Sequence, residues 1–111
     1  ACQQPEGYWT RSLLDPEHAP GPETSGTAFF TYGLLWGMNN GFLDKATYQP
    51  VVEKAWKYLT TVALQSDGRV GYVQPIGEKA IPGQVVDANS TANFGVGAFL
   101  LAACEMVRFL N

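Results

Sequence analysis

Apolar and polar positions divide the chain into three helical segments separated by two long loops. Residues 24–39 are apolar on nearly every side, which is typical of a buried helix. From Pro50 to Ala63, apolar residues recur at helical spacing with charged residues between them, which predicts an outer, amphipathic helix. A third segment, from near residues 89–91 to Leu110, is again apolar almost throughout. The expected order is therefore buried, amphipathic, buried.

Capping residues indicate where these helices begin and end. The hydroxyl of Thr24 or Ser25 can accept hydrogen bonds from open amides, so the first helix is expected to begin there. Gly41 suits a left-handed C-terminal cap. Asp44 is the candidate N-cap of the second helix, and Pro50 is expected in its first turn, where proline is tolerated.

The loops that precede the two buried helices are too rich in proline and glycine for regular structure. Residues 5–23 hold four prolines and two glycines, and residues 65–89 hold two prolines and several glycines. A short extended stretch is expected at residues 69–73. Loops of this length in a compact domain usually carry function, so we expect function or strain in both.

A repeated phrase relates the two buried helices. Thr27–Gly33 (TAFFTYG) returns sixty-four residues later as Thr91–Gly97 (TANFGVG), and each copy follows a loop with an acid-glycine turn. A period of roughly sixty residues is too long for common two-helix solenoids and indicates helical hairpins with long loops. Alternating inner and outer helices predict an all-α fold, a partial α/α toroid whose inner helices begin at one mouth. Six such hairpins need about 360 residues.

Composition excludes several classes of partner. The chain has 111 residues, 46% hydrophobic and 15% charged, with a net charge of -3. The seven lysines and arginines are scattered, so no nucleic acid is expected. No run approaches the ~18 apolar residues of a membrane span, so no membrane is expected either. Barely one complete hairpin and a further helix would leave a large apolar seam on both sides, so we expect association or a missing N-terminal portion.

Neither metal nor cofactor is expected. The only histidine, His18, lies in a proline-rich loop without cysteine or histidine at ligand spacing. Cys2 and Cys104 are expected to be free thiols, and Cys104 is expected in the core because it falls within an apolar helical run. The sequence does not indicate a compartment.

Several phrases together carry a family resemblance. As a set they are similar to the C-terminal third of glycoside hydrolase families 88 and 105, which are unsaturated glucuronyl and rhamnogalacturonyl hydrolases on an (α/α)6 barrel. The resemblance implies that residues 1–111 are a single C-terminal fragment of such a domain. The phrases are Glu6–Arg11 (EGYWTR), Pro22–Ala28 (PETSGTA), Tyr32–Gly37 (YGLLWG), Pro50–Trp56 (PVVEKAW) and Phe94–Ala102 (FGVGAFLLA).

The resemblance also implies a reaction. These families remove a 4,5-unsaturated uronic acid from the non-reducing end of lyase products, by hydrating the vinyl ether double bond of the sugar. An aspartate protonates the double bond and activates water, so the usual carboxylate pair of glycoside hydrolysis is not the pattern to seek. No position here corresponds to that aspartate. The chain is therefore expected to contain no catalytic residue, to be inactive alone, and to bind an unsaturated uronic-acid oligosaccharide.

Candidate binding residues cluster before the first helix. Residues 23–27 resemble the segment that meets the sugar in the family, and hydroxyls and free amides at a helix N-terminus suit a carboxylate or a sugar hydroxyl; a simple helix cap is the alternative. Trp9 can stack on a sugar face and Arg11 can pair with a carboxylate, unless both only pin the loop. Trp36 and Trp56 are expected in the core. The predicted substrate-binding residues are Trp9, Arg11, Glu23, Thr24, Ser25 and Thr27.

Two functions remain open from the sequence. The first is a portion of an unsaturated uronyl hydrolase that associates with a missing N-terminal portion. The alternative is a small non-catalytic helical module that binds carbohydrate or protein through the same loops and forms a homo-oligomer. Gln74 and residues 89–91 occupy the equivalent mouth in the second copy of the repeat and are weaker candidates for binding.

Overall fold

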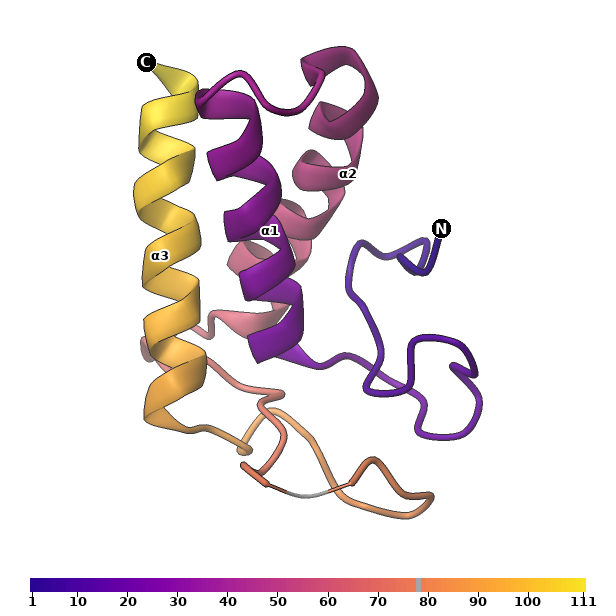
Figure 1. Ribbon diagram of the computed structural model, residues 1–111. Helices are drawn as coiled ribbons and strands as arrows, with labels where there is room; N and C mark the ends of the chain where they lie inside the picture. Colours follow the sequence, from indigo (N-terminus) through magenta and orange to yellow (C-terminus); the bar gives the residue numbers. More distant parts are fainter. Residues whose placement is uncertain (78) are drawn as a thin grey trace.

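Helices form the body of the molecule, and two long loops gather at one end of it. The computed structural model describes residues 1–77 and 79–111. Figure 1 shows α1 between α3 and α2, with the loops that precede α1 and α3 at the same end of the helices. This arrangement confirms the predicted all-α class, and it places both loops at one mouth. The elements are α1 (Thr24–Asn39), α2 (Lys45–Tyr58), the π-helical segment η1 (Leu59–Ala63) and α3 (Asn93–Leu110).

The start of α1 is as predicted, but its cap is a different residue. α1 begins at Thr24, and the side chain of Glu23, rather than a hydroxyl, accepts from the first amides. At the other end Gly41 has φ +77°, as a left-handed cap requires. α2 begins at Lys45, and the side chain of Asp44 caps it as predicted. The boundaries of both helices therefore follow from local capping.

Two expectations about helix starts were wrong. Pro50 lies inside α2, more than a turn after Lys45, because the Asp44 cap starts the helix earlier. α3 begins at Asn93 rather than at residues 89–91, and its N-cap, Ala92, has no side-chain hydrogen bond. The polar residues before it bond to one another instead: the Ser90 hydroxyl accepts from the main-chain amide of Asp87 at 3.0 Å and donates to the Asp87 carboxylate at 3.3 Å. That local turn uses the groups that were expected to cap the helix.

Two clusters of buried side chains hold the helices together. The first joins α1, η1 and α3 and includes Ala28, Leu59 and Phe99, and the second joins α1, α2 and α3 around Leu35. Trp56 packs against both clusters and stacks on Phe99 with ring centroids 5.9 Å apart. Its predicted core position is therefore confirmed in part, since the ring is half-buried.

Trp36 does not lie in the core, contrary to expectation. It is 43% exposed and stacks on Phe42, which is itself 74% exposed, with centroids 5.6 Å apart. The reason is that no described element covers this face of α1.

Cys104, also expected in the core, is exposed on α3, and both cysteines are free. The exposed apolar side chains of α1 and α3 are Phe29, Phe30, Trp36, Val96, Leu100, Leu101, Val107 and Leu110. The expected apolar faces are present.

The composition of α3 departs from one expectation. By length and composition alone, the helix Asn93–Leu110 could cross a membrane, although no such run was anticipated. One side of it packs on α1, where Glu105 is only 5% exposed and accepts a hydrogen bond from the Asn39 side chain at 2.8 Å. A helix that is apolar on most sides is also typical of the interior of a large protein.

Expected strand structure is nearly absent. In the described ranges, the stretch at residues 69–73 forms only an isolated antiparallel bridge between Leu64 and Val70. Tyr72 has φ +62°, which interrupts an extended chain. This bend brings the Tyr72 carbonyl to the amide of Thr24, 2.7 Å away, so the second loop is attached to the start of α1.

Candidate functional site

A small hollow lies where the two loops meet the N-terminal end of α1. Its volume is about 160 Å³. The first loop, the start of α1 and the second loop all contribute to it, so residues far apart in the sequence line one space. It brings together three of the predicted binding residues, Trp9, Arg11 and Glu23. The lining residues are Trp9, Thr10, Arg11, Leu13, Glu23, Gly26, Phe30 and Gln74.

Glu23 closes the N-terminus of α1 from within the protein. One carboxylate oxygen accepts hydrogen bonds from the main-chain amide of Ser25 at 3.0 Å, from the Ser25 hydroxyl at 2.7 Å and from the main-chain amide of Gln74 at 3.1 Å. The other oxygen accepts from the amide of Gly26 at 2.6 Å. The side chain is buried, at 2% exposed. The amides that were expected to be free for a substrate carboxylate are therefore occupied, because a carboxylate of the chain already holds the positive end of the helix.

Thr24 is part of a buried polar network. Its hydroxyl donates to the Gly71 carbonyl at 2.6 Å, so the Tyr58 hydroxyl, 2.7 Å away, must donate to Thr24. Burial raises the pKa of Tyr58 well above its usual range, which keeps this donor protonated. The network attaches α2 and the second loop to the first turn of α1.

The other two predicted hydroxyls also serve the loop. Ser25 donates to Glu23, and the Thr27 hydroxyl accepts from the amide of Trp9 at 3.0 Å. Both side chains are buried and lie outside the lining of the hollow. Their geometry positions Trp9 and Glu23, and their direct contact with a substrate stays a prediction.

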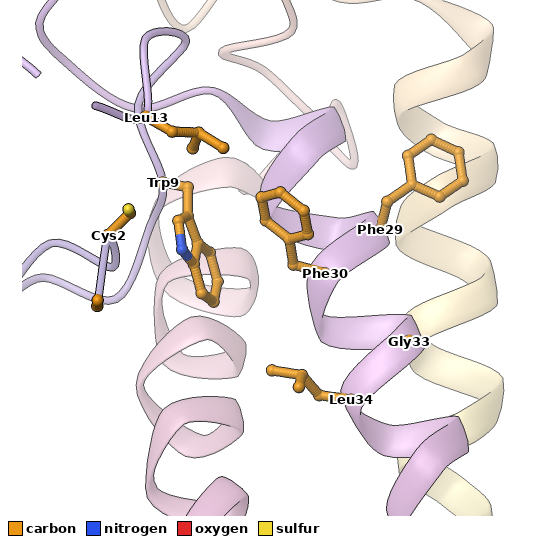
Figure 2. A pocket seen from close by; sticks show the side chains of 8 residues that line it. Cys2, Trp9, Leu13, Phe29, Phe30, Gly33 and Leu34 are labelled. Atoms are coloured by element: carbon orange, nitrogen blue, oxygen red, sulfur yellow. The ribbon is translucent and has the colours of Figure 1, made fainter. Parts of the chain in front are cut away.

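Trp9 forms the wall between the polar hollow and a larger apolar one. Its ring packs edge-to-face on Phe30, with centroids 5.1 Å apart. Figure 2 shows Trp9, Leu13 and Phe30 around the apolar hollow, Trp9 and Leu13 coming from the first loop and Phe30 from α1. This second space has a volume of about 450 Å³. A half-buried indole held by its backbone at such a border is suited to contact with a sugar face.

Arg11 reaches across to the second loop. Its guanidinium donates to the side-chain oxygen of Gln84, and it donates to the main-chain oxygen of Gln84 at 3.4 Å. A second contact joins the loops, since the His18 ring nitrogen lies 3.1 Å from the Ala80 carbonyl. Over residues 1–77 and 79–111, Arg11 forms no ion pair. The other two arginines do, Arg69 with Asp67 and Arg108 with Glu105.

Two glutamines contribute to this site although little in the sequence indicates them. Gln74 was only a weak candidate, yet it lines the hollow, and its main-chain amide donates to the Glu23 carboxylate that caps α1. Gln84 was not anticipated, because it is 73 residues from its partner and lies in a loop without periodic pattern. In the part of the chain that the structure describes, no cluster of histidine, cysteine or acidic residues could hold a metal ion.

Comparisons with known proteins place these features in context. A family model described as Glycosyl Hydrolase Family 88 matches residues 1–110. An unsaturated 3S-rhamnoglycuronyl hydrolase of Formosa agariphila is 47% identical over 106 residues, which are 96% of this chain and 27% of that protein. The matching part of such relatives is thus about a quarter of their length.

Solved structures share the fold. A glycosyl hydrolase family 88 protein from Bacteroides vulgatus has a TM-score of 0.92 and 78% identity, covering 97% of this chain and 31% of that one. A protein described as a polysaccharide lyase also has a TM-score of 0.92, with 87% identity over 98% of this chain and 31% of that one. The three helices therefore match part of an α/α toroid, as predicted.

Proposed function

The chain belongs to glycosyl hydrolase family 88, and from this premise we propose that it forms part of the substrate-binding wall of an enzyme that removes 4,5-unsaturated uronic acid from oligosaccharides. In this role it is a C-terminal portion of the toroid, with the hollow at the mouth. The relative from Formosa agariphila is named as a hydrolase of unsaturated rhamnoglycuronyl substrates, which supports this substrate class.

One observation carries the proposal: the guanidinium of Arg11 lines the hollow without an acidic partner among the described residues. Its hydrogen-bond partners belong to Gln84, and amide oxygens accept hydrogen bonds without cancelling a positive charge. A guanidinium binds carboxylates through two parallel hydrogen bonds. A uronic acid supplies that carboxylate, and the adjacent Trp9 supplies an apolar surface for the sugar ring.

The position of the carboxylate matters for the reaction. In a 4,5-unsaturated uronic acid it is attached to C5, so an arginine that holds it also orients the double bond between C4 and C5. A proton added to C4 leaves positive charge at C5, which the ring oxygen stabilises. Water then adds at C5 and loses a proton. The hemiketal so formed opens by breaking the bond between C5 and the ring oxygen, and the hemiacetal this leaves at C1 breaks down and releases the next sugar. The net change is the addition of one water molecule.

This reaction needs an acid that also activates water. Among the described residues, Glu23 is the carboxyl group that lines the hollow, but its two oxygens accept hydrogen bonds from the start of α1 and from the main-chain amide of Gln74. It is thus engaged as a helix cap. We therefore assign the acid to residues beyond this chain, and we assign to the chain the binding of the uronic acid.

The exposed apolar faces of α1 and α3 fit this role. In an α/α toroid, inner helices pack between neighbouring inner helices, and apolar faces of this kind become buried there. The alternative, a non-catalytic module that buries the same faces in a homo-oligomer, also uses them. It does not require an arginine at the mouth that has no acidic partner among the described residues. The arginine therefore favours the hydrolase portion.

Replacing Arg11 with alanine tests the proposal. Hydrogen bonds to charged groups contribute about 1.5–3 kcal/mol, so R11A is expected to weaken binding of a lyase-derived unsaturated disaccharide roughly ten- to a hundredfold. An NMR titration of the 111-residue chain measures this change even for weak binding. Arg69→Ala is the matched control, because Arg69 is exposed and paired with Asp67. Equal affinity for the R11A chain and the unsubstituted chain would contradict the proposal.

A further inference from the structure

We propose that Gln84 is a positioning residue that holds the Arg11 guanidinium at the hollow and leaves its positive charge available to a substrate carboxylate. The inference rests on the proposed function and extends it to the second loop. It makes the recognition of the uronic acid a property of two loops together, since Arg11 precedes α1 and Gln84 precedes α3.

Gln84 holds the Arg11 guanidinium through two acceptors, one on its side chain and one on its main chain. One guanidinium nitrogen donates to the side-chain oxygen of Gln84 and another lies 3.4 Å from its main-chain oxygen. A free arginine side chain has many rotamers, and the entropy lost when a ligand orders it weakens the contact. Holding the guanidinium in advance removes part of that cost. The contact of His18 with Ala80 keeps the same two loops together.

The chemistry of the partner decides what remains for a ligand. A guanidinium has five N–H donors, and the two hydrogen bonds to Gln84 use two of them. Three donors remain for a carboxylate. Because the Gln84 amide is neutral, the full positive charge of Arg11 remains as well. A glutamate at this position would hold the loops at least as firmly, but it would form an ion pair with Arg11 and compete with the substrate.

Gln84→Glu therefore separates positioning from a purely structural role. The probes are a lyase-derived unsaturated disaccharide as the free acid and as its methyl ester, titrated by NMR against the 111-residue chain. The unsubstituted chain is expected to prefer the acid. Q84E is expected to lower affinity for the acid about tenfold and to leave the ester unchanged. Its thermal midpoint is expected to stay equal or rise.

Two further variants make the result specific. Gln84→Ala keeps the main-chain contact and loses the side-chain contact, so a smaller loss of acid preference, roughly threefold, is expected. Ile81→Glu adds the same charge at an exposed site of the same loop, and it is expected to lower the acid preference less than Q84E does. If Q84E and Q84A keep the acid preference of the unsubstituted chain, the inference is overturned while the proposed function stands. If the unsubstituted chain itself shows no acid preference, the proposed function fails.

Discussion

Replacing Glu23 with alanine is expected to lower the free energy of unfolding by about 2–4 kcal/mol, because the change removes a helix cap and leaves buried donors without acceptors. The carboxylate accepts from Ser25, from Gly26 and from the amide of Gln74, which belongs to the other loop. Alanine can replace none of these contacts. Chemical denaturation of the 111-residue chain, followed by circular dichroism, measures the loss.

Glu17→Ala is the matched control for this prediction. Glu17 lies in the same loop as Glu23, but its side chain is exposed. Its removal is expected to change the free energy of unfolding by less than about 0.5 kcal/mol, as is usual for surface substitutions. Equal effects of the two substitutions would show that the Glu23 carboxylate does not stabilise the start of α1. Such a result would also release Glu23 for a role toward a ligand.

Gly7→Ala is expected to destabilise the chain by roughly 2–5 kcal/mol, from backbone strain and overlap together. Gly7 has φ +101°, a conformation that side chains other than glycine rarely adopt. A β-carbon at this position would also overlap the main-chain carbonyl of Lys54 in α2, which cannot rotate away. The first loop would have to leave the helix, and thermal unfolding measures the consequence.

Gly21→Ala separates the two causes. Gly21 has a similar φ of +95° and belongs to the same loop, but no atom lies within 4 Å of a β-carbon built there. Only the strain applies, so a loss of about 1 kcal/mol is expected. A Gly7→Ala chain as stable as the Gly21→Ala chain would mean that the loop does not pack on α2 as closely as the structure shows.

Local signals in the sequence account for most of the fold. The helix of residues 24–39 follows from its apolar run and the polar residues that precede it, and the Asp44-capped helix follows from periodicity and capping. These signals depend on neighbours within a turn. The exposure of Trp36 could not be predicted in the same way. An apolar helix face looks the same in a sequence whether or not the chain supplies the element that covers it.

The site was predictable only in outline. Trp9, Arg11 and Glu23 were singled out, and they do line one hollow. The details that decide their roles are long-range contacts: Gln74 completes the cap of Glu23 from 51 residues away, and Gln84 holds Arg11 from 73 residues away. Both glutamines lie in a loop without helical or strand periodicity. Neither pairing therefore leaves a pattern in the sequence.

We propose that this chain binds the unsaturated uronic acid but does not itself supply the acid of the reaction. The most direct test follows the ultraviolet absorbance of the double bond in a lyase-derived unsaturated disaccharide, in the presence of the 111-residue chain at a concentration where NMR shows binding. The absorbance is expected to stay constant while the disaccharide is bound. Loss of the absorbance with multiple turnovers would contradict it, because the catalytic acid would then lie within these residues.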